Sequence, residues 1–84
     1  MEVNHYYKLY YVGDLYVVFR VIDGTNVYVA YDTENRDGVL NWTKTKRSIE
    51  VITSIINDKD VYPDAKLIEI TKDEYENYLI AGEI

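Results

Sequence analysis

Three short apolar runs, separated by two turn sequences, occupy the first 31 residues and limit the folds open to this chain. Residues 5–12, 15–22 and 27–31 are rich in β-branched and aromatic side chains, which favour strands. The breaks are Gly13-Asp14 and residues 23–26, and both contain residue types that tolerate the positive φ angles of hairpin turns. The N-terminal third therefore predicts an antiparallel β-meander.

The length of the first turn predicts which side chains share a face of this sheet. A two-residue loop places Val12 opposite Leu15 and Tyr10 opposite Val17, and directly opposed residues lie on one face. On this register the core face carries Leu15, Val17, Phe19 and Val21, flanked by Tyr6, Tyr10, Val12, Tyr28 and Ala30. The other face combines an arginine with tyrosines, and its candidate binding residues are Tyr7, Tyr11, Tyr16, Arg20 and Tyr31.

This second face is too apolar to lie entirely in water. The chain has ten tyrosines but one Phe and one Trp, and a tyrosine ring with its polar hydroxyl suits half-buried positions and interfaces. Three fates stay open for the face: burial under a second helix, a dimer interface, or a surface that binds a ligand or partner.

The C-terminal half predicts helices. Within residues 44–57, isoleucines recur at helical spacing, although their β-branching also favours a strand; we predict a helix near 45–57. Thr71 and Glu74 have the spacing of a capping box, which predicts a second helix near 71–81. Residues 66–70 resemble a strand, and residues 39–43 could add another.

We therefore predict one α+β domain over residues 1–84. It consists of a three- to four-stranded, mainly antiparallel sheet, beginning with the β-meander, and one or two helices packed on one face.

Nothing in the composition supplies a catalytic constellation. The chain has one histidine, His5, no cysteine and no glycine-rich phosphate loop, so a nucleophile with its base and a zinc ligand set are both missing. Asp58, Asp60 and Asp64 lack the glycine and distal glutamate of a calcium loop. We expect a non-enzymatic protein without a metal or cofactor.

The net charge of −6 argues against binding to duplex DNA, since contacts to phosphates need a basic face. No targeting sequence and no apolar run of ~20 residues is visible. We expect a cytoplasmic protein that does not bind membranes.

One basic cluster interrupts the acidic sequence. Its candidate ligand-contacting residues are Trp42, Lys44, Lys46 and Arg47, because an aromatic ring beside cations suits phosphate, base or carboxylate recognition. The simpler interpretation is a half-buried tryptophan on a strand, followed by a solvated helix start.

The segment 65–78, AKLIEITKDEYENY, resembles the tails of many small phage and prophage proteins of low-GC bacteria. This resemblance implies an accessory protein that acts by binding. Our leading hypothesis is a phage-encoded inhibitor that occupies a host defence protein stoichiometrically. The alternatives are a homo-oligomeric sponge that sequesters a (cyclic) nucleotide signal, and a structural or regulatory phage protein; we expect a homo-oligomer.

Overall fold

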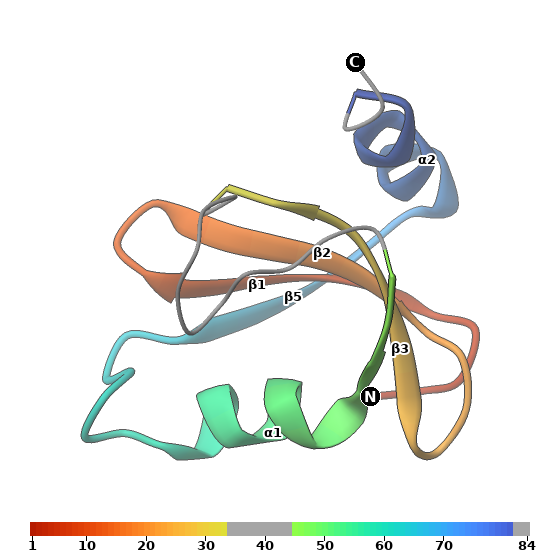
Figure 1. Ribbon diagram of the computed structural model, residues 1–84. Coiled ribbons are helices and arrows are strands. Elements are labelled where there is room, and N and C mark those ends of the chain that lie inside the picture. Colours follow the sequence, from red (N-terminus) through yellow and green to blue (C-terminus); the bar gives the residue numbers. More distant parts are fainter. Residues whose placement is uncertain (34–44, 82–84) are drawn as a thin grey trace.

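The computed structural model describes residues 1–33 and 45–81, which form an antiparallel sheet and two helices (Figure 1). The strand order is β4-β3-β2-β1-β5, and every neighbouring pair is antiparallel. The predicted α+β class is confirmed, with five strands in the described residues rather than three or four. The elements are β1 (Tyr6–Val12), β2 (Leu15–Val21), β3 (Asn26–Asp32), β4 (Thr45–Ser48), α1 (Ile49–Asn57), β5 (Lys66–Ile70) and α2 (Lys72–Ala81).

The helix predicted near 45–57 is correct only for its second part. Residues 45–48 form β4, which pairs with β3 and becomes an edge of the sheet. The helix α1 then begins after Ser48, whose Oγ accepts a 3.2 Å hydrogen bond from the amide of Glu50. The helically spaced isoleucines begin only at Ile49, and pairing with a distant strand decides the structure of residues 45–48. The strand predicted at 39–43 lies outside the described residues.

The helix predicted at 71–81 is confirmed as α2. Its first turn is closed by Thr71, whose Oγ1 accepts from the amide of Glu74 at 3.1 Å. This is the bond expected of an N-cap residue.

The two helices cover opposite faces of the sheet (Figure 1). Ile52 and Ile55 of α1 pack in the larger core, whereas Tyr75 of α2 packs against Val18 and Ala30 on the other side. Of the three fates left open for the second face, burial under a second helix is the one observed, so the helices lie on opposite faces rather than together on one. Both faces are apolar enough to need a cover.

A β-bulge also overturns the predicted register of the first hairpin. Tyr10 lies opposite Tyr16 while Val12 lies opposite Leu15, so Tyr11 is an extra residue on β1. An extra residue reverses the side-chain alternation beyond it. The predicted pairing of Tyr10 with Val17 is therefore wrong, and the face under α1 carries Tyr7, Leu9, Tyr11, Val17, Phe19, Val21, Val27 and Val29.

The turn between β2 and β3 is organised by one carboxylate. Asp23 Oδ1 accepts hydrogen bonds from the amides of Thr25 and Asn26, each at 2.8 Å, and from the Thr25 hydroxyl at 3.0 Å. The bond from the Thr25 amide is the main cause that lowers the Asp23 pKa from 3.8 to about 2. This turn sets the register in which Arg20 faces Tyr28.

We expect Asp23→Ala to reduce the acid dependence of stability. A carboxyl group whose pKa is depressed in the folded state stabilises the fold at pH values above its unfolded-state pKa. This contribution is lost as the pH falls from about 3.8 toward 2. Urea unfolding at several pH values across that window should show a steeper decline for the parent than for Asp23→Ala. The control is Asp14→Ala in the other hairpin; equal slopes for parent and Asp23→Ala would contradict the prediction.

Candidate functional site

The sheet face that α2 covers holds the best candidate site. Tyr75, Tyr78 and Leu79 lie at i, i+3 and i+4, so they share one side of α2, and all three pack toward the sheet. The side of the sheet below α2 presents tyrosines and cations. We call this side of the sheet, with the residues of α2 that pack on it, the α2 face.

A row of opposed side chains crosses four strands on the α2 face. Arg20 of β2 stands at its centre, with Tyr6 of β1 opposite on one side and Tyr28 of β3 on the other. Tyr28 in turn lies opposite Lys46 of the edge strand β4. Because directly opposed residues share a face, two tyrosines and two cations alternate along this row, with Lys46 exposed at its end.

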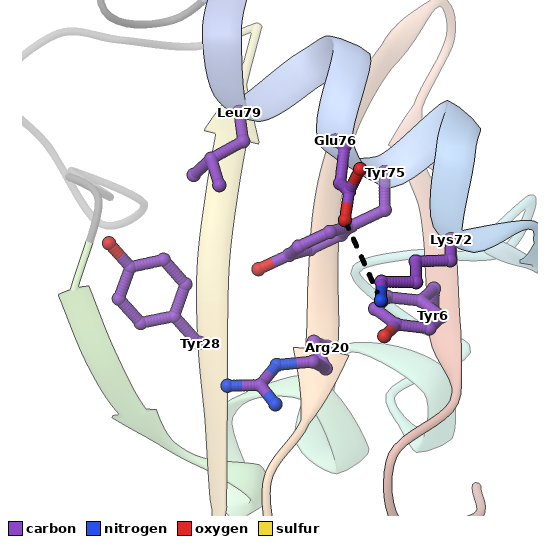
Figure 2. A pocket seen from close by; sticks show the side chains of 7 residues that line it. All are labelled: Tyr6, Arg20, Tyr28, Lys72, Tyr75, Glu76 and Leu79. Atoms are coloured by element: carbon purple, nitrogen blue, oxygen red, sulfur yellow. Dashed lines mark ion pairs between the residues drawn. The ribbon is translucent and has the colours of Figure 1, made fainter.

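A pocket of about 380 Å³ lies where this row passes under α2 (Figure 2). Figure 2 shows the Arg20 guanidinium between Tyr28 and Tyr6, with the Tyr75 ring above it. The Tyr75 ring is 4.9 Å from the Tyr6 ring between centroids. The lining residues are Tyr6, Arg20, Tyr28, Lys72, Tyr75, Glu76 and Leu79.

The pocket has a positive balance in an otherwise acidic chain. On its α2 side, Lys72 and Glu76 form a 3.9 Å ion pair (Figure 2). Arg20, which is half-buried, has no carboxylate in ion-pair contact within the described residues. Burial raises the pKa of Tyr75 against the opposing effect of the Arg20 guanidinium, so its phenol is neutral and protonated at physiological pH.

A second cluster on the α2 face surrounds a lysine with tyrosines. Lys8 Nζ lies 4.2 Å from the centroid of the Tyr16 ring and 5.0 Å from that of Tyr10, and it donates a 3.1 Å hydrogen bond to the Tyr78 hydroxyl. Burial acts to lower the pKa of Lys8, but the hydrogen bonds to Tyr10 and Tyr78 outweigh it and raise the pKa. Burial and the contact with Tyr78 raise the pKa of Tyr16 to about 12. This cluster is internally satisfied, with the ammonium held by cation–π contacts.

The nine candidate binding residues that the sequence analysis proposes do not lie together in the structure. Tyr16, Arg20 and Tyr31 lie on the α2 face, as predicted, and Lys46 joins them there. Trp42 and Lys44 lie outside the described residues. Arg47 lies opposite Val27 and therefore on the other face.

Tyr7 and Tyr11 require a correction, because the bulge turns both into the core under α1. Their exposed fractions are 6% and 2%. The Tyr7 hydroxyl accepts from the Glu2 amide at 2.9 Å, and the Tyr11 hydroxyl donates to Asp32 Oδ1 at 2.8 Å. The structure therefore places both side chains in the core, away from the α2 face.

Of the residues that line the pocket, the sequence analysis proposes only Arg20 as a binding residue. The predicted register places Tyr6 and Tyr28 on the core face, and the helical pattern of residues 71–81 predicts no binding role for Tyr75. The spacing of Tyr75, Tyr78 and Leu79 carried the signal that α2 has one apolar side, but not which sheet face that side meets.

Within the described residues, no group of three or more His, Cys, Asp or Glu side chains is arranged to hold a metal ion. No helix in this part of the chain has the length and apolar character needed to cross a membrane. Comparison of the chain with protein-family models, curated proteins and solved structures finds no match in any of the three.

Proposed function

We propose that this chain is a non-enzymatic binding protein that acts by stoichiometric occupation of a protein partner through the α2 face. The observation that carries the proposal is the row of Tyr6, Arg20, Tyr28 and Lys46. Tyrosine and arginine are the residue types that dominate binding energy at interfaces, where they supply large contact area and fixed hydrogen-bond donors.

We propose that the partner is a host defence protein and that this chain is a phage-encoded inhibitor of it. Support comes from the small size of the chain, its net charge of −6, and the resemblance of residues 65–78 to phage accessory proteins. An acidic chain with a locally basic, aromatic row can steer toward a complementary surface of one partner and away from others.

Co-expression with a panel of bacterial defence systems tests this function. We expect one system to lose its protection against phage and one of its proteins to copurify with the tagged chain in a 1:1 complex. Arg20→Ala should weaken that complex by at least about 30-fold, as at an interface hot spot. Lys59→Ala, in the turn after α1, is the matched control because it removes one cation away from the α2 face. An unchanged defence panel with no copurifying protein would refute the proposal.

A further inference from the structure

The pocket under α2 has the composition of a small-ligand site. Its volume of about 380 Å³ lies at the lower end of the range of clefts that bind small ligands. It offers half-buried phenol rings on either side of a guanidinium, so aromatic surface and positive charge converge in one place. We propose that it binds a small aromatic anion of the nucleoside monophosphate class.

Arg20 supplies the anion contact. Its guanidinium is a rigid, always charged fork that matches phosphate in bidentate geometry. In the described residues it has no carboxylate in ion-pair contact. A partly buried cation without a counter-charge is costly, so a bound anion would offset part of the cost of burying Arg20.

Two further cations favour a phosphate over a singly charged carboxylate. Lys72 lines the pocket on the α2 side, and Lys46 lies next to Tyr28 in the cross-strand row. One carboxylate, Glu76, offsets Lys72 at 3.9 Å. Among the lining residues Arg20 therefore keeps its charge for an anion, and Lys46 adds a second positive charge beside the pocket, at the exposed end of the row.

Tyr28 and Tyr6 supply the aromatic contact. Both are half-buried and lie directly opposite Arg20 on its two neighbouring strands. A planar base can stack on the accessible part of a tyrosine ring while its phosphate reaches the guanidinium, the combination of stacking and cation contacts that proteins use on single-stranded nucleic acids.

The test is calorimetric titration of the purified chain with AMP, adenosine and inorganic phosphate. We expect AMP to bind one site per chain with a dissociation constant below about 1 mM. Adenosine and phosphate, which each carry half of the ligand, should bind at least about ten-fold more weakly. Equal binding of phosphate and AMP, equal binding of adenosine and AMP, or no saturable AMP binding would each overturn the proposal.

Variants assign the binding to this pocket. Arg20→Gln should weaken AMP at least about 30-fold and leave adenosine unchanged, whereas Tyr28→Leu should weaken AMP and adenosine alike. Lys46→Gln, at an exposed edge position, should weaken AMP without affecting folding, and Lys59→Gln should have no effect. If Arg20→Gln does not fold, the Tyr28→Leu and Lys59→Gln pair decides, because Tyr28 lines the pocket and Lys59 does not: equal AMP affinities would place the ligand elsewhere.

This inference does not depend on a protein partner, because the titration uses the isolated chain. Failure of AMP binding would leave the proposed inhibitor function standing. Failure of the defence panel would likewise leave the pocket proposal intact.

Discussion

Tyr75→Ala should lower the free energy of unfolding by about 3–5 kcal/mol, the cost of removing a buried aromatic ring. Tyr75 is 5% exposed, and it is the side chain by which α2 enters the core formed with Val18 and Ala30. Its ring also lies 4.9 Å from that of Tyr6. A ten-residue helix is marginal in isolation, so α2 depends on this contact for its place on the sheet.

Urea unfolding monitored by circular dichroism measures the effect. In a domain of this size, each kcal/mol corresponds to roughly 4–8 °C in Tm, so thermal scans should agree. Tyr75→Phe is the matched control: it keeps the ring and removes the hydroxyl, and we expect a loss of about 1 kcal/mol. If Tyr75→Ala lowered the free energy of unfolding no more than Tyr75→Phe does, the Tyr75 ring would not be what holds α2 on the sheet.

The second large effect is expected at the opposite face. Ile52→Ala should destabilise the protein by about 2–5 kcal/mol, because it leaves a cavity in the larger core. Ile52 has an exposed fraction of 0% and packs between α1 and the sheet. A total stability of about 5–15 kcal/mol is typical of small domains, so this variant should unfold at a clearly lower urea concentration.

Val51→Ala provides the comparison within the same helix. Val51 is 39% exposed, and its replacement also exchanges a β-branched residue for alanine in α1. We expect a change within about 0.5 kcal/mol, as is usual for surface positions. The same urea experiment checks it; similar losses for Val51→Ala and Ile52→Ala would contradict the docking of α1 through Ile52.

The two helices show how far local patterns determine structure. Thr71, Glu74 and the spacing of Tyr75 and Tyr78 predict α2 nearly to the residue, because capping and periodicity are local properties. The start of α1 was predicted too early, since residues 45–48 pair with β3. Strand pairing joins distant residues, and no local window contains that information.

The candidate site was only partly predictable for a related reason. The sequence predicts that Arg20, Tyr16 and Tyr31 share a face and singles out Lys46 for its charge, and the structure has all four on the α2 face. The exclusion of Tyr7 and Tyr11 depended on the bulge, which adds one residue to β1. A shift of one residue moves every side chain beyond it to the other face, so this bulge decided the face of each β1 tyrosine. The faces of Tyr28 and Tyr31 follow instead from the pairing of β2 with β3, which has an irregularity of its own between Val18 and Phe19.

By itself, the sequence determined the β-meander, the capped C-terminal helix and the α+β class, because turn residues, strand-forming runs and capping residues act over a few positions. The tertiary structure alone decided the register of β1 on β2, the strand pairing of residues 45–48 and the face that each helix covers. Those features follow from how two apolar faces are buried at once by one short chain. The pocket around Arg20 is a product of that arrangement, since its residues come from three strands and one helix.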